Sequence, residues 1–220
     1  MAHRLLPFRQ YSDHEVINLF SVNLDRLPSE LKLMAPNDDG INADGVLMQV
    51  RAGNMAENDV VTVGEDGRFQ GATAPPVGRN PYPTVPLQVE PCKGISGVIG
   101  MTLAQTLSHD ENSENLLYNP VKKDELNAVL SGQAVPLATR GVFTLTEKAF
   151  DVTATNSWAE VAPGSALTPS TSNAEVGKFK ASLPAAGGQN IGSVLATGER
   201  VDNGSADNWS GPYAVIQLRI

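Results

Sequence analysis

Residues 131–146 read SGQAVPLATRGVFTLT, a segment rich in apolar and β-branched side chains with an arginine and a glycine at its centre. Gly132 is placed to end a preceding helix, and residues 135–137 begin a strand. Arg140 and Gly141 predict a bend between two strand halves, after which the chain enters the core; Arg140 could instead be a paired surface charge. The segment holds no obvious catalytic group. We therefore predict that it is β scaffold.

The rest of the chain agrees with a β fold. Its 220 residues include 20 glycines and 15 prolines, which favour many turns and few long helices. The last ten residues, GPYAVIQLRI, alternate an apolar face with a more polar one, as a half-buried strand does. Short strands separated by Gly, Pro, Asn and Asp are typical of a sandwich or barrel.

Further strands are predicted at 45–53, 58–67, 94–106, 163–170, 177–183 and 190–200, and at 15–24, whose apolar density suits burial on both faces. One helix is predicted after residue 118. Asn119 can cap it, Pro120 suits its first position, and its length up to Gly132 is about three turns.

Two segments carry features that a lone domain does not need. Residues 71–91 contain prolines at 75, 76, 81, 83 and 86, which predict an extended surface loop. The first 14 residues gather apolar side chains that either pack on their own domain or form an arm that docks on a neighbouring subunit. We therefore expect an arm at 1–14 and one β-rich domain at 15–220, with the loop at 71–91 and a helical insertion at 110–131. The candidate partner-binding residues are Leu5, Leu6, Phe8, Tyr11, Pro81 and Tyr82.

Charge and cysteine content exclude several classes of protein. The net charge is −8 with scattered basic residues, so the phosphate backbone of nucleic acid is a poor partner. Cys92 is the only cysteine, which excludes an intrachain disulfide and a cysteine-cluster metal site. No apolar run is long enough for a signal peptide or a membrane span. We expect a soluble protein.

Candidate sites for chemistry are weak. His3, His14 and His109 lie in polar or terminal segments, without a G-x-S-x-G elbow. NDDGINADG, at 37–45, could offer oxygen ligands to a cation, but its spacing does not fit a calcium loop and Asx side chains make turns on their own. No phosphate-binding loop occurs. We predict no catalytic residue, no cofactor and no metal, and hence no enzyme.

The order of the strand motifs is more specific than any one of them. The succession IGMTLAQT, SGQAVPLATRGVFTL, PGSALTPS, IGSVLATGE and AVIQLRI, over residues 94–220, resembles the head decoration (capsid cement) proteins of tailed bacteriophages. GVLMQVRAGNMAENDVVTVG, at 45–64, would be the opening strands of that family. YSDHEVINLFSVN, at 11–23, is similar to the starts of virion proteins of marine cyanophages. The chain departs from the family in its length and in lacking an acidic residue after Gly164.

The resemblance implies an all-β domain, a β-barrel or β-tulip, on the outside of the capsid. Its function would be to bridge neighbouring capsid subunits. Its partners would be the major capsid protein and further copies of itself, as a dimer or trimer. It would be assembled in the host cytoplasm and be located on the outer surface of the virion.

Two other functions stay open from the residues alone. A receptor- or glycan-binding virion module, such as a head fibre or tail protein, would use exposed aromatics. Trp158, Trp209, Tyr213 and Phe143 could line a sugar groove or fill a β core. A β-fold glycan hydrolase would need two carboxylates facing a cleft, and no pair among the 24 acidic residues is marked out.

Overall fold

The computed structural model describes residues 14–22, 43–51, 87–107, 109–110, 112–152, 157–172, 175–183, 186–200 and 210–220. The strand predicted at 58–67 and most of the predicted loop at 71–91 lie outside these residues. The structural statements below concern the described residues.

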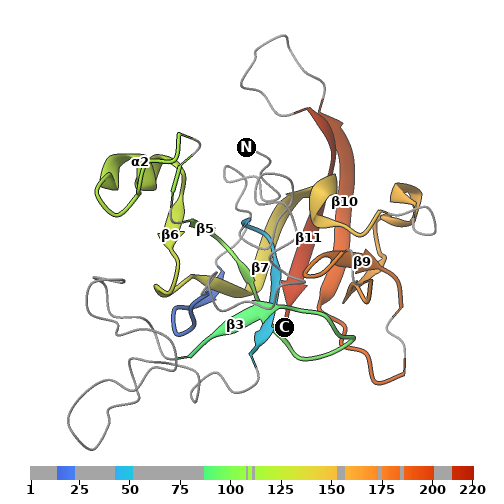
Figure 1. Cartoon of the computed structure of the whole chain (residues 1–220). Coiled ribbons are helices and arrows are strands. Elements are labelled where there is room, and N and C mark those ends of the chain that lie inside the picture. The colour runs from blue at the N-terminus through green and yellow to red at the C-terminus, as the bar shows by residue number, and fades with distance from the viewer. Residues whose placement is uncertain are drawn as a thin grey trace, which may run out of the picture.

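Nine strands form one antiparallel sheet that curls into a half-barrel (Figure 1). Its order is β3-β2-β4-β7-β11-β10-β8-β9, with β1 also paired to β7. The strands are β1 (Glu15–Ile17), β2 (Leu47–Val50), β3 (Val89–Pro91), β4 (Val98–Thr102), β7 (Leu137–Thr146), β8 (Ala166–Pro169), β9 (Phe179–Ala181), β10 (Gly192–Arg200) and β11 (Gly211–Arg219). Two 3₁₀ turns, η2 (Glu147–Ala149) and η3 (Trp158–Glu160), lie between β7 and β8. The predicted all-β, barrel-like fold is confirmed.

Strand β7, formed by the segment that opens the sequence analysis, lies at the middle of the sheet. It pairs with β11 without a break in register from Arg140 to Thr146. The predicted bend at Arg140 and Gly141 is therefore wrong. Gly141 makes room instead, because an added Cβ would lie 2.8 Å from the His14 Cβ and 2.9 Å from the Phe143 ring. Arg140 is exposed and pairs with Glu15 at 3.7 Å, which agrees with its interpretation as a paired surface charge.

The core lies on the inner face of the curled sheet. Ala214, Ile216 and Leu218 of β11 are fully buried, which confirms the alternation predicted for the last strand. They belong to a cluster with Leu145, Leu167, Phe150, Phe179 and Ile191. A second cluster joins β2, β3 and the start of β7, and consists of Val22, Val46, Met48, Val89, Val135, Leu137 and Val176.

The strand predicted at 15–24 is much shorter and less buried than expected. β1 covers only Glu15–Ile17, its residues are exposed or half-buried, and the Leu19 side chain is 52% exposed. The reason is its position, because it lies along an edge of β7 and then crosses to Gln88 and Ala134 through single bridges at Ser21. Of this segment, Ser21 and Val22 are fully buried.

The insertion before β7 is a small lobe, here called the satellite lobe (residues 103–131), and it is only partly helical. Helix α2 (Pro120–Glu125) follows β5 (Gln105–Leu107) and precedes β6 (Ala128–Leu130), and the two strands pair in parallel. Its small core consists of Leu116, Ala128 and Leu130, with Leu107, Leu117 and Leu126 packed against it. In Figure 1 the lobe lies on the opposite side of the molecule from β10.

The predicted start of the helix is confirmed and its predicted end is wrong. The Asn119 side chain accepts a hydrogen bond from the Lys122 N–H at 3.2 Å, and Pro120 is the first helical residue. The helix ends at Glu125 because Asn127, with φ of 47°, turns the chain and donates its side-chain amide to the Leu103 carbonyl at 2.9 Å. Gly132, with φ of 86°, lies in the turn after β6 instead.

Asn119→Ala is expected to weaken the satellite lobe by about 1 kcal/mol, since the first turn of α2 loses its cap. Hydrogen exchange should show faster exchange of the amides of Lys122 and of β6, with the half-barrel unchanged. Asn119→Asp keeps an accepting oxygen and is the matched control. Equal exchange in Asn119→Ala and the unaltered chain would contradict the prediction.

The remaining predicted elements agree with the structure. β2 lies within 45–53, β8 within 163–170, β9 within 177–183 and β10 within 190–200. The strand region predicted at 94–106 holds β4 and the start of β5, which ends at Leu107 and belongs to the separate two-stranded sheet. The predicted loop at 71–91 is wrong at its end, where β3 pairs with β2 through Val89, Glu90 and Pro91. A proline is tolerated there because β3 is a terminal strand of the sheet order. Within the described residues, no helix is long and apolar enough to cross a membrane.

Candidate interaction surfaces

The partner-binding residues predicted from the sequence, Leu5, Leu6, Phe8, Tyr11, Pro81 and Tyr82, lie outside the described residues. They stay a prediction. The described surface offers two other candidates that the sequence did not single out, the satellite lobe and the outer edge of β10.

The histidines and acidic residues considered for chemistry are dispersed. His14 is half-buried and packs edge-on against Phe143, with ring centroids 5.9 Å apart. His109 is exposed in a bridge with Asn115, and His3 lies outside the described residues. Of the acidic segment at 37–45, the structure describes only residues 43–45, of which Asp44 is buried. Within the described ranges, no three His, Cys, Asp or Glu side chains come together as metal ligands.

Cys92 is a buried free cysteine. Its Sγ donates to the Gly94 carbonyl at 3.4 Å. Burial raises the pKa of its thiol, and the nearby Glu90 carboxylate raises it further, although the hydrogen bond with the Gly94 backbone lowers it. A protonated, inaccessible thiol is a poor nucleophile, so we assign Cys92 a packing role.

The aromatic residues considered for a sugar groove do not form one surface. Phe143 is buried, and Trp158 packs edge-on against Phe150 with centroids 5.4 Å apart. Tyr213 covers Gly198 on the neighbouring strand, where an added Cβ would lie 2.6 Å from the ring. Trp209 lies outside the described residues. Phe143 and Trp158 therefore serve the core, as one of the two interpretations predicted.

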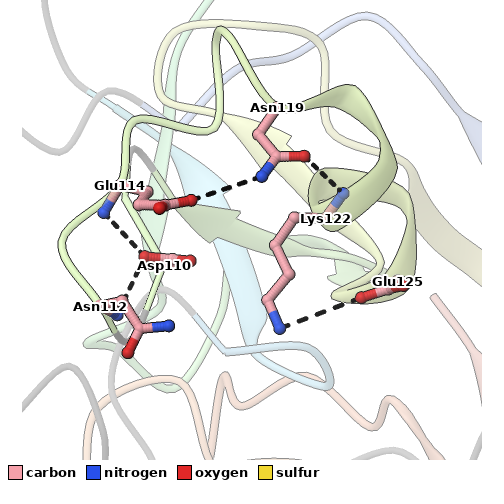
Figure 2. Close-up of polar contacts among 6 residues, drawn as sticks. All are labelled: Asp110, Asn112, Glu114, Asn119, Lys122 and Glu125. Atoms are coloured by element: carbon pink, nitrogen blue, oxygen red, sulfur yellow. Dashed lines mark hydrogen bonds and ion pairs between the residues drawn. The ribbon is translucent and has the colours of Figure 1, made fainter.

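The satellite lobe presents two exposed apolar side chains on a rigid support. Tyr118 is 81% exposed and Val121 is 67% exposed. The support is polar, and Figure 2 shows its contacts. Asp110 accepts from the backbone N–H groups of Asn112 at 2.9 Å and Glu114 at 2.8 Å.

The same network continues to α2. The Asn119 amide donates to Glu114 at 3.5 Å, while Lys122 and Glu125 form an ion pair at 3.9 Å (Figure 2). The Asn115 side chain accepts from the Leu117 N–H at 2.9 Å. Because these oxygens hold the lobe together, they are engaged within the chain. The lobe is therefore better suited to an apolar protein contact than to a hydrogen-bonded sugar.

The terminal strands of the sheet order are covered along their outer edges. Ser21 bonds to the outer edge of β3, accepting from the Val89 N–H at 2.9 Å. The Asp151 N–H donates to the Phe179 carbonyl of β9 at 2.7 Å. The Asp151 carboxylate accepts from the Ser170 hydroxyl at 2.6 Å, which fixes this cover in place. Each of these outer edges is therefore met by another part of the chain.

The outer edge of β10 is covered only over its first part. β8 pairs with Gly192 and Ser193, and Val194 exchanges backbone hydrogen bonds with Gly164 and Ser165. Beyond a bulge at Leu195, residues 196–200 pair with β11 alone, and residues 195–200 are exposed except for half-buried Gly198. We call residues 195–200 the β10 edge. An exposed strand edge is a site at which a second chain can add a strand.

Comparison with models of protein families, with curated proteins and with solved structures finds no match for this chain.

Proposed function

We propose that this chain is a virion structural protein that binds the outside of the major capsid shell and cements neighbouring capsid subunits. Support comes from the ordered set of motifs that resembles the decoration proteins of tailed bacteriophages. Each of these motifs overlaps a strand of the half-barrel: β4, β7, β8, β10 and β11 in chain order. The proposal rests on this observation: the five motifs follow one another along the chain in the same order as the five strands that they overlap.

The arrangement of the surface fits a mechanical function. A bridging protein needs a rigid scaffold with contact regions that face different neighbours. In Figure 1 the satellite lobe lies at the left of the molecule and β10 lies to the right of its centre. Each contact can be weak, because many copies on one lattice act together. This function needs no catalysis, and we assign none. The partners are the major capsid protein and other copies of this chain, on the outer surface of the virion.

Exposed Tyr118 favours a second candidate function, which is a receptor- or glycan-binding virion module. Tyr118 is 81% exposed, and Glu114 and Asn115 are close to it in sequence. An exposed aromatic ring can stack on a sugar while neighbouring carboxylate and amide groups form hydrogen bonds with its hydroxyl groups. We rank this function second because the side-chain oxygens of Glu114 and Asn115 already accept hydrogen bonds within the lobe.

The test is to add the purified full-length chain to heads of the encoding virus that were assembled without it, and to image them by electron microscopy. We expect extra density at regular positions on the outer surface. Heads that already carry the protein are the control and should gain none. Failure to bind any lattice position would reject the cement function, and a glycan array would then test the second candidate.

Removing residues 1–13 is expected to lower the occupancy of such heads several-fold, because Leu5, Leu6, Phe8 and Tyr11 would be lost while His14 keeps its contact with Phe143. Occupancy is measured from the averaged density at the binding positions. Leu183→Ala, at a side chain that is 85% exposed, is the control and should bind as the unaltered chain does. Unchanged occupancy after the truncation would reject the arm as a capsid contact.

A further inference from the structure

Within the β10 edge, alternate residues direct their backbone groups away from β11. In β11 the odd and even residues turn their backbone groups to opposite neighbours, since Arg219 donates to Ile191 on the β10 side and Ile220 donates to Thr139 on the β7 side. Tyr213 therefore bonds with its register partner Gly198. It follows that Thr197 and Glu199, on either side of Gly198, direct their N–H and C=O groups away from β11.

The outward N–H and C=O groups of Thr197 and Glu199 are arranged so that the edge can pair with the same edge of a second copy. If two copies of the edge run antiparallel about a two-fold axis at Gly198, Thr197 lies opposite Glu199 of the partner subunit and Glu199 lies opposite Thr197 of the partner subunit. Both of these are hydrogen-bonded pairs, so all four outward N–H groups meet a carbonyl. We propose that the β10 edge joins two copies of this chain in this register.

The side chains in this register are compatible. Gly198 faces Gly198 of the partner subunit in a non-hydrogen-bonded pair, where Cα atoms approach to about 4.5 Å. Ala196 faces Arg200 of the partner subunit, and Thr197 faces Glu199 of the partner subunit, so no like charges oppose each other. A two-fold axis at Glu199 would instead place two glutamates directly opposite, which is destabilising.

A second copy fits this edge better than an unrelated strand does. Any extended segment could use the free N–H and C=O groups, but the two-fold axis at Gly198 uses every outward group and opposes no like charges. The outer edges of β3 and β9 are each met by another part of the chain, at Val89 and at Phe179. A pair of five-residue segments, 196–200, is small, so the contact is weak in solution and suits a lattice that holds many copies. The inference rests on the proposed function for its role on the capsid, whereas its test uses the free protein.

The test is disulfide trapping of the register. Residues 196 and 200 of the two copies form a non-hydrogen-bonded pair, which brings their Cα atoms within the 4.4–6.8 Å or so that a disulfide needs. Mixing Ala196→Cys chains with Arg200→Cys chains under mild oxidation should give a covalent dimer. Each variant alone is the matched control and should give several-fold less. Native Cys92 is buried and does not compete.

A third substitution tests the backbone contact. Thr197→Pro, added to both cysteine variants, removes an outward N–H while sparing the hydrogen bonds between β10 and β11. The trapped dimer should fall to the level of the single-variant controls, whereas Thr197→Ala, which keeps the N–H, should retain it. Circular dichroism shows whether each variant folds.

The dimer would be overturned by equal trapping in the mixture and in the single variants, or by trapping that Thr197→Pro leaves unchanged. Absence of trapping together with lower capsid occupancy for Thr197→Pro would also overturn it, and would assign the edge to a capsid strand. Capsid binding that persists without trapping would leave the cement function standing.

Discussion

Phe179→Ala is expected to destabilise the half-barrel by about 3–5 kcal/mol, the usual cost of removing a fully buried aromatic side chain. Phe179 is completely buried on β9, and its ring lies 5.8 Å from that of Phe150, which in turn packs against Trp158. The loss combines unfilled volume with the loss of an aromatic pair. Strand β9 and its covering segment at 150–151 should loosen together, because both pack through this cluster.

The measurement is urea unfolding followed by tryptophan fluorescence, which reports on Trp158 and Trp209. The midpoint should fall strongly, and the dependence of the free energy on urea should stay the same. Leu183→Ala, two residues beyond β9, removes an exposed side chain and should change stability by no more than about 0.5 kcal/mol. Similar midpoints for the two variants would show that the cluster around Phe179 is not part of the core.

Sequence patterns predicted the fold best where one face of a strand is buried. In β11, Ala214, Ile216 and Leu218 alternate with less buried residues because the side-chain period of a strand is two. The half-barrel itself follows from many such strands joined by turns. The predicted strand at 163–170 begins three residues too early, at 163 instead of Ala166, because Gly164, with φ of 91°, lies in the turn before β8.

Prediction failed where tertiary pairing decides the outcome. Residues 126–130 have good helix propensity, yet 128–130 pair with β5 and their apolar side chains fill the small core of the lobe. Pairing with a distant segment thus outweighs a local preference of a few tenths of a kcal/mol per residue. The high density of apolar residues at 15–22 wrongly predicted a strand buried on both faces. The density does not show which side chains become exposed when the segment lies at an edge of the sheet.

The candidate surfaces were harder to predict than the fold. That β10 has a free edge depends on β8 covering only its first residues, and no local pattern encodes the length of a neighbouring strand. The sequence of the satellite lobe did contain an indication of its exposed apolar surface. Tyr118 and Val121 are apolar residues beside the helix start, and they lie outside the leucines that form the core of the lobe.

Gly192→Ala is expected to destabilise the protein by about 2–6 kcal/mol, since backbone strain and overpacking each typically cost about 1–3 kcal/mol. Gly192 begins β10 with φ of 154°, and an added Cβ would overlap the Gln217 carbonyl oxygen of β11. That oxygen belongs to the backbone, so no side-chain rotation can relieve the overlap. Strands β10 and β11 would have to separate at the start of β10, in the part of β10 that β8 covers.

The matched control is Gly187→Ala. Gly187 also has a positive φ, 79°, but an added Cβ meets no atom within 4 Å. It should therefore show only the conformational cost, about 1 kcal/mol. Urea unfolding measures both variants, and hydrogen exchange should show faster exchange of the β10 and β11 amides in Gly192→Ala alone. If the two variants lose equal stability, the close approach of β10 to β11 does not limit this position, and the support for the β10 edge must come from β8 and the bulge at Leu195.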